Sequence, residues 1–172
     1  LDGKDSAMYN GSMTKVKATQ NADNAYIYGV SAGVQFDFNE RVSFKSVLNY
    51  TYGRYISSNL DTVIPLDHIA PLYGQTSLTY KAKGFDGEFF IKYNGKKSLA
   101  DYSPSGEDNL QYATTNGMPS WYTLNLRYSY QVNKYIQAQL NLDNITDKAY
   151  RVFASGINAP GRNIYGGAKY SF

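Results

Sequence analysis

The stretch Arg162-Asn163-Ile164-Tyr165-Gly166-Gly167-Ala168-Lys169-Tyr170-Ser171-Phe172 decides the fold of this chain. Side chains alternate between the two faces of a β-strand. One face of this stretch is apolar or small, with residues 164, 166, 168, 170 and 172, and the other is mostly polar. An exposed terminal Phe172 would be a liability at the edge of a soluble sheet. In a membrane barrel the strand is paired on both sides, and the aromatic residue lies at the interface.

Six further stretches alternate in the same way, at residues 26–38, 42–52, 72–82, 88–94, 122–132 and 136–143. The connections between the seven predicted strands are alternately short and long. The short turns are 39–41, 83–87 and 133–134, and the long loops are 57–71, 95–120 and 144–160. Up-and-down connectivity therefore places every short turn, together with Phe172, at one end of the sheet. Outer-membrane barrels show this asymmetry.

The composition limits the class of protein. The length of 172 residues indicates one domain, and a net charge of +3 is too small to indicate a nucleic-acid partner. The chain has no apolar run of the roughly 18 residues that a spanning helix needs. Its mean hydropathy is -0.48, but barrel strands carry apolar residues only at every second position. One His and no Cys leave no Ser-His-Asp or Cys-His arrangement, so we expect no enzyme, no catalytic residue and no cofactor.

Alternation alone does not say which face is buried, because soluble sandwiches and lipocalin-like barrels also alternate. The polar faces carry Glu88, Arg127, Asp143 and Lys169 among many amides and hydroxyls, which suits a wet lumen. The apolar faces carry Tyr and Phe near their ends, as aromatic girdles do. We therefore predict an all-β fold, an antiparallel up-and-down transmembrane β-barrel segment of about seven strands.

The segment Leu142-Asp143-Asn144-Ile145-Thr146-Asp147-Lys148-Ala149-Tyr150-Arg151 resembles a signature near the C-terminus of TonB-dependent outer-membrane receptors. The family continues with a Pro-Gly-Arg element and a last strand that ends in Phe, which match Pro160-Gly161-Arg162 and Tyr170-Ser171-Phe172. Ile64-Pro65 to Pro71 with Gln75-Thr76-Ser77-Leu78, and Ser120-Trp121-Tyr122-Thr123-Leu124-Asn125, resemble two further passages of the family. The resemblance covers about residues 25–172.

The resemblance implies that residues 1–172 are the C-terminal part of a 22-stranded barrel in the bacterial outer membrane. Residues 1–24 would then be an extracellular loop, and the plug domain is absent. The implied function is active transport of a scarce nutrient, such as an iron-siderophore or haem, energised through TonB. Cobalamin, other metals and glycans stay possible cargoes. The implied partners are outer-membrane lipid and lipopolysaccharide, the rest of the barrel and its plug, the TonB complex, and the barrel-assembly machinery through the C-terminal strand, with no nucleic acid.

Two alternatives stay open at this point. A small self-contained outer-membrane structural or adhesin barrel would need residues 1–24 to supply an eighth strand. A soluble ligand-binding β-barrel would show the same alternation but would not partition into detergent.

The candidate substrate-binding residues lie in the long loops: His68, Tyr102, Tyr112, Arg151 and Arg162. Arg supplies charge-assisted hydrogen bonds and Tyr supplies stacking, which suits an anionic aromatic siderophore. Tyr170 and Phe172 are candidates for outer-membrane targeting and assembly. No metal site is expected, because Asp101, Glu107 and Asp108 match no calcium-loop spacing and are typical of a solvated acidic loop. Asn144 and Asp147 are expected to organise the strand-to-loop turn through bonds to the backbone.

Overall fold

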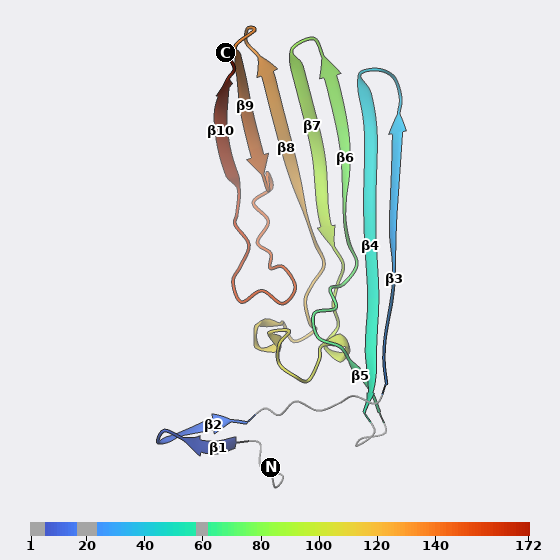
Figure 1. Ribbon diagram of the computed structural model, residues 1–172, viewed down its shortest axis with the longest axis vertical. Helices are drawn as coiled ribbons and strands as arrows, with labels where there is room; N and C mark the ends of the chain where they lie inside the picture. Colours follow the sequence, from blue (N-terminus) through green and yellow to red (C-terminus); the bar gives the residue numbers. More distant parts are fainter. Residues whose placement is uncertain (1–5, 17–23, 58–61) are drawn as a thin grey trace.

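The main sheet contains the seven predicted strands, all antiparallel to their neighbours, in the order β10-β9-β8-β7-β6-β4-β3 (Figure 1). It is seen in a computed structural model that describes residues 6–16, 24–57 and 62–172. The strands are β3 (Asn24–Asp37), β4 (Val42–Ser57), β6 (Tyr73–Ala82), β7 (Phe85–Asn94), β8 (Trp121–Gln131), β9 (Ile136–Asp143) and β10 (Asn163–Tyr170). The short strand β5 (Thr62–Pro65) pairs with the end of β4. The predicted fold class is confirmed, and the sheet is open, with β3 and β10 at its edges.

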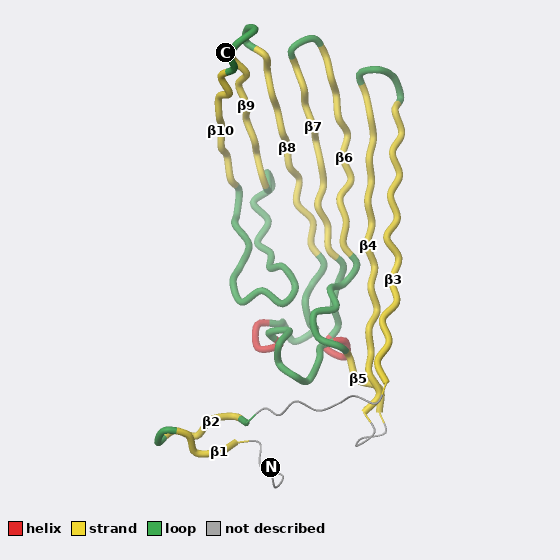
Figure 2. Tube along the Cα trace, viewed as in Figure 1, coloured by secondary structure: helices red, strands yellow, loops and turns green. Residues whose placement is uncertain are grey.

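The short turns and the C-terminus lie at one end of the sheet and the long loops at the other, as predicted (Figure 2). Two of the short turns use the same device. The side-chain Oδ1 of Asn39 accepts the N–H groups of Arg41 and Val42 at 2.8 and 3.0 Å. Asn133 Oδ1 accepts those of Tyr135 and Ile136 at 2.9 and 3.0 Å. An Asn carbonyl that mimics the backbone in this way favours a tight turn.

The pairing register aligns the apolar residues into rows that cross the whole sheet. One row takes a single residue from each of the seven strands: Phe36, Phe44, Leu78, Phe89, Leu126, Leu142 and Ile164. Most of these side chains are exposed, including Phe36, Phe89 and Ile164. A register slip of one residue would turn every one of them to the other face. The rows form the apolar outer face that a membrane barrel requires.

Aromatic residues bracket this apolar face at a constant spacing. Four strands carry two outward aromatic rings eight positions apart: Tyr28 and Phe36, Phe44 and Tyr52, Phe85 and Tyr93, Tyr122 and Tyr130. At about 3.4 Å per residue the spacing is roughly 27 Å along the strand. An apolar band flanked by aromatic girdles is about 25 Å tall. Rings also pair across strands, as Tyr28 and Tyr52 do with centroids 5.0 Å apart.

The opposite face is polar and has one buried apolar residue at its centre. Phe90 is 0% exposed, and the guanidinium of Arg127 lies 4.6 Å from its ring centroid. Arg127 Nη1 also lies 3.4 Å from Glu88 Oε2 on the neighbouring strand. A long cationic side chain can cover an aromatic ring while its charge stays in water. This cover lets the polar inner face hold a phenylalanine that the alternation alone does not explain.

Three features depart from the prediction by more than two residues. The strand β4 continues to Ser57 and pairs with β5, so a sheet extension occupies part of the predicted 57–71 loop. The strand β7 begins at Phe85, because Phe85 already pairs with Tyr130. Within the predicted loop 1–24, β1 (Ser6–Tyr9) and β2 (Ser12–Lys15) form a hairpin. Residues 1–5 and 17–23 of this predicted loop lie outside the described residues. None of the described helices is long and apolar enough to span a membrane.

Candidate functional site

The three long loops contact one another at their end of the sheet. We name them loop A (residues 66–72), loop B (95–120) and loop C (144–162). Loop B carries two short 3-10 helices, η1 (Leu99–Asp101) and η2 (Leu110–Tyr112). Its two ends are joined where Lys97 and Met118 exchange backbone hydrogen bonds of 3.0 and 2.9 Å. Gly117 is required at this crossing, because it has a φ of 89° and a Cβ there would lie 2.1 Å from Lys97 O.

Asp108 joins loop A to loop B. Its side chain accepts the backbone N–H groups of His68 and Ser103 at 2.8 and 3.3 Å. His68 Nδ1 lies 3.9 Å from the same carboxylate. Asp108 is only 1% exposed, so the expectation of a solvated acidic loop is wrong for this residue. Buried carboxylates occur where hydrogen bonds replace water, and these backbone donors do so.

Asp101 belongs to the same predicted acidic loop, and it too has specific partners. Ser98 Oγ donates to Asp101 Oδ2 at 2.7 Å, and Arg54 Nη2 donates to Asp101 Oδ1. The hydrogen bond from Ser98, followed by that from Arg54, lowers the pKa of Asp101 below its ordinary value of 3.8. These bonds attach the start of loop B to the extension of β4.

Lys97 connects all three loops. Its Nζ donates to Ile69 O in loop A and lies 4.4 Å from the ring centroid of Phe153 in loop C. The residue is 5% exposed. Burial lowers the pKa of Lys97, and the nearby carboxylate of Asp108 opposes that shift.

Asn144 and Asp147 organise the base of loop C, as the sequence predicted. Asn144 is 3% exposed and has a φ of 50°. Its Oδ1 accepts Lys148 N–H at 2.8 Å, and its Nδ2 donates to Lys148 O at 2.9 Å. Asp147 Oδ1 accepts Arg162 N–H at 2.8 Å, while Arg162 Nε donates to Ile145 O at 2.9 Å. The motif residues therefore close the loop on itself.

A pocket of about 320 Å³ lies between loops B and C. Five aromatic side chains line it: Tyr102, Tyr112, Trp121, Tyr150 and Phe153. Trp121 and Tyr150 pack with ring centroids 4.2 Å apart, and Tyr102 meets Phe153 at 5.6 Å. Asn109 Nδ2 donates to Ala154 O at 2.8 Å and holds the two loops together beside the pocket.

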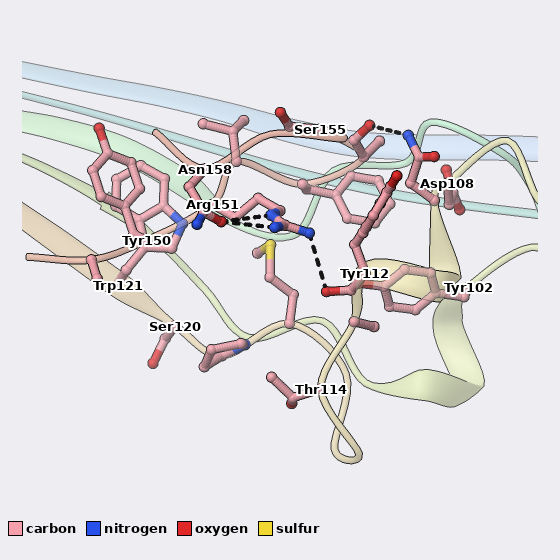
Figure 3. A pocket seen from close by; sticks show the side chains of 18 of the residues that line it. Tyr102, Asp108, Tyr112, Thr114, Ser120, Trp121, Tyr150, Arg151, Ser155 and Asn158 are labelled. Atoms are coloured by element: carbon pink, nitrogen blue, oxygen red, sulfur yellow. Dashed lines mark hydrogen bonds between the residues drawn. The ribbon is translucent and has the colours of Figure 1, made fainter. Parts of the chain in front are cut away.

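Arg151 reaches across this pocket from loop C to loop B (Figure 3). Its Nε and Nη2 donate to Asn158 Oδ1 at 3.0 and 2.8 Å, and its Nη1 donates to Tyr112 O at 3.5 Å. The guanidinium carbon also lies 4.9 Å from the Tyr112 ring centroid. These contacts hold the cationic group in one orientation.

Three aromatic side chains of the pocket carry a polar group that is uncharged: the hydroxyls of Tyr102 and Tyr150 and the indole N–H of Trp121. Burial raises the pKa of Tyr102 and of Tyr150, with smaller contributions from Asp108 and Asp143 respectively. The indole N–H of Trp121 is buried and meets no acceptor among the described residues. A buried donor without an acceptor is costly, and it marks the pocket as a place where polar groups are not fully satisfied.

The structure brings together three of the five predicted substrate-binding residues. Tyr102, Tyr112 and Arg151 line the pocket. His68 lies in loop A beside Asp108, with a side chain that is 67% exposed. Arg162 lies at the base of loop C, bonded to Ile145. Tyr170 packs against Tyr135 and Phe172 at the short-turn end, with Ser171 N–H donating to Tyr135 O at 2.9 Å.

Sequence reasoning missed four residues that build the loop cluster: Lys97, Trp121, Tyr150 and Phe153. Trp121 is the only tryptophan in the chain, and it directly follows a long loop, which was a usable signal. Lys97 gave none, because its partners are far away in the sequence. The described residues contain no group of three or more His, Cys, Asp or Glu side chains that could hold a metal ion.

The fold and its apolar outer face define a section of an outer-membrane β-barrel. The profile of the family described as "TonB dependent receptor-like, beta-barrel" matches residues 3–145, and the chain belongs to this family of bacterial outer-membrane proteins. None of the curated protein sequences compared with the chain matches it.

Solved structures share the fold. The "Copper transporter OprC" superposes with a TM-score of 0.69 at 20% identity, over 86% of this chain and 24% of that one. The FrpB iron transporter from Neisseria meningitidis superposes with a TM-score of 0.65 at 13% identity, over 86% of this chain and 24% of that one. A mutant of the ferric enterobactin receptor PfeA from Pseudomonas aeruginosa, in complex with enterobactin, superposes with a TM-score of 0.61 at 16% identity. The superposition covers 86% of this chain and 23% of that one. The chain thus spans about a quarter of the length of these proteins.

Proposed function

We propose that the protein containing this chain is an outer-membrane receptor that imports a scarce nutrient with energy supplied through TonB. The observation that carries the proposal is the family match over residues 3–145. The apolar rows that cross all seven strands support it, because they suit the lipid-facing wall of a barrel. The mixed polar residues of the other face suit a wet lumen.

The proposed place of the chain is the C-terminal part of a 22-stranded barrel, with residues 1–24 in an extracellular loop. The two open edges, β3 and β10, support a larger barrel, because unpaired strand edges are not tolerated in lipid. The remaining strands and a plug would come from the rest of the protein. Lipid, lipopolysaccharide and the TonB complex are the other proposed partners, with the barrel-assembly machinery engaging Tyr170 and Phe172.

The long loops would then face outward, since outer-membrane barrels have short periplasmic turns and longer extracellular loops. An iron-siderophore or haem is the proposed cargo. The aromatic pocket between loops B and C supports a cargo with flat organic groups. The hairpin of β1 and β2 pairs only with itself among the described strands, which argues against a self-contained eight-stranded barrel.

Uptake by whole cells tests this function. The gene of the complete receptor is deleted, and import of radioactive ferric siderophore and of haem is measured in the parent strain, the deletion strain and a strain without TonB. We expect import of one cargo to fall to background in both mutants and to return when the receptor is restored. Unchanged import of every cargo in the deletion strain, under nutrient limitation, would contradict the proposal.

A further inference from the structure

The pocket between loops B and C has the size of a site for one ring system. Its volume of about 320 Å³ is at the small end of ligand pockets, which span roughly 300–1,000 Å³. Aromatic side chains stand on both sides, with Trp121 and Tyr150 from one direction and Tyr112 and Tyr102 from the other (Figure 3). A flat group fits between such walls better than a bulky aliphatic one.

The charges around the pocket favour a negative group. Three charged residues line it: Asp108, Lys148 and Arg151. The oxygens of Asp108 already accept two backbone N–H groups from loops A and B. Arg151 forms no ion pair with any residue that the structure describes. A guanidinium has five N–H groups, and the bonds to Asn158 and Tyr112 occupy one on each of its three nitrogens.

Arg151 is therefore both oriented and able to bind. Two of its N–H groups remain for a ligand, and its contacts with Asn158 and Tyr112 fix the plane in which they point. A cation held in position before binding loses less freedom when an anion arrives. Planar, charge-assisted recognition of a carboxylate is the interaction for which arginine is best suited.

A metal ion has no comparable partners at this place. No group of three or more metal-ligating side chains occurs within residues 6–16, 24–57 and 62–172. The nearby phenols of Tyr102 and Tyr150 are poor ligands, because burial raises their pKa and keeps them protonated. The chemistry of the pocket therefore addresses an organic group rather than a metal that the group carries.

We infer that this pocket binds a single planar aromatic ring bearing a carboxylate, with the negative oxygens on Arg151 and the ring between the aromatic walls, and that it does so equally well with or without a metal. The inference rests on the proposed function only for the arrival of the ligand from outside the cell. It adds that the carrier, and not its metal, is what these two loops recognise.

Binding of benzoate to the complete receptor in detergent tests the inference. Saturation-transfer NMR detects weak binding of such a small probe. Two matched probes separate the contribution of the charge from that of the flat ring. Benzamide has the ring without the charge, and cyclohexanecarboxylate has the charge without the flat ring. We expect benzoate to bind about tenfold more tightly than either, because each lacks one of the two interactions. Equal affinities for the three probes would overturn the inference.

Substitutions locate the site. Arg151→Gln is expected to weaken benzoate about tenfold and to leave benzamide unchanged. Arg151→Lys retains the charge without the planar guanidinium. Its affinity for benzoate is expected to lie between those of the unaltered receptor and of Arg151→Gln. Arg41→Gln removes an arginine from the opposite end of the sheet and should change nothing. Heat-modifiable migration in gel electrophoresis verifies that each variant is folded. Unaltered benzoate binding in folded Arg151→Gln would place the site elsewhere.

Metal dependence and transport are separate readouts. Adding ferric or cupric ions should leave the affinity of the receptor for benzoate unchanged, after correction for the benzoate that the ions complex in solution. Binding that requires the metal would refute the inference even if import is confirmed. Conversely, selective benzoate binding together with unchanged import in the deletion strain would contradict the proposed function alone.

Discussion

The sheet and the loop cluster are built on opposite principles. The sheet exposes its apolar residues, as Phe36 and Ile164 show, and relies on a regular backbone ladder. The loop cluster buries polar residues, among them Lys97, Asp108 and Asn144, and satisfies each with particular hydrogen bonds. The apolar face contacts lipid, so many different apolar side chains can occupy its positions. The position of a buried charge tolerates far fewer substitutions, because loss of one partner leaves the other partner buried and unpaired.

A charge on the outer face should have the largest effect. Leu48 lies midway between the outward rings Phe44 and Tyr52 on β4, and the neighbouring Val47 points to the inner face. Leu48→Arg is expected to destabilise the barrel by about 2–4 kcal/mol, because it places a charge in the apolar band. Urea unfolding of the receptor in lipid vesicles measures this effect.

Val47→Arg is the matched variant, since it introduces the same charge one residue away on the wet face. We expect a change below about 1 kcal/mol for Val47→Arg. If the two variants were equally destabilising, the assignment of the faces would be wrong.

Removal of the buried carboxylate should loosen the loops without harming the sheet. Asp108→Asn places an amide N–H₂ where backbone donors of His68 and Ser103 point, and we expect a local loss of about 1–3 kcal/mol. Hydrogen exchange should rise in loops A and B while β6 to β9 stay protected. Glu40→Gln, in a short turn at the far end, serves as the control. Faster exchange in the strands as well would show that the two regions are not independent.

The base of loop C offers a sharper test of the same independence. Asn144→Gly keeps the left-handed backbone conformation available and removes only the side-chain bonds to Lys148 and Pro160. Hydrogen exchange in loop C is expected to increase by the equivalent of about 1–2 kcal/mol. Asn144→Ala also strains the backbone and should be worse. Identical behaviour of the two variants would mean that the backbone conformation contributes little.

Acidification should have the smallest effect, a local loss of stability in loop B. The pKa of Asp101 is lowered by its bonds to Ser98 and Arg54, so these contacts stabilise loop B fully above the ordinary value of 3.8. The stabilisation is lost as pH falls through the lower pKa of the folded protein. Exchange near residues 98–102, corrected for its intrinsic pH dependence, should therefore stay slow at pH 5 and rise only below about pH 4. In Asp101→Asn this pH step should vanish. A rise already between pH 6 and 5 would indicate another titrating group.

Alternation was sufficient to predict the seven strands, because the two faces of a strand differ at neighbouring positions. The prediction failed where a residue looked polar by its own type but is buried by distant contacts. Asp108 was expected to be solvated, yet its partner His68 is 40 residues away. The extension of β4 was missed for the same reason, since Arg54, Tyr55 and Ile56 pair with residues 24–26 of β3, which are far away in the sequence.

The site shows the same division. The residue types of loop C identified Arg151, Asn144 and Asp147, because their motif is continuous in the chain. Sequence order could not show that Arg151 reaches Tyr112, or that Trp121 packs on Tyr150, since these contacts join different loops.

The order of amino acids was thus enough to predict a membrane-barrel sheet, its two faces and the end at which its short turns lie. Those properties arise from a period of two residues and from local turn chemistry. The pocket, its oriented arginine and the burial of Asp108 and Lys97 depend on how the folded loops meet. Such contacts join residues that are distant along the chain, and no local pattern encodes them.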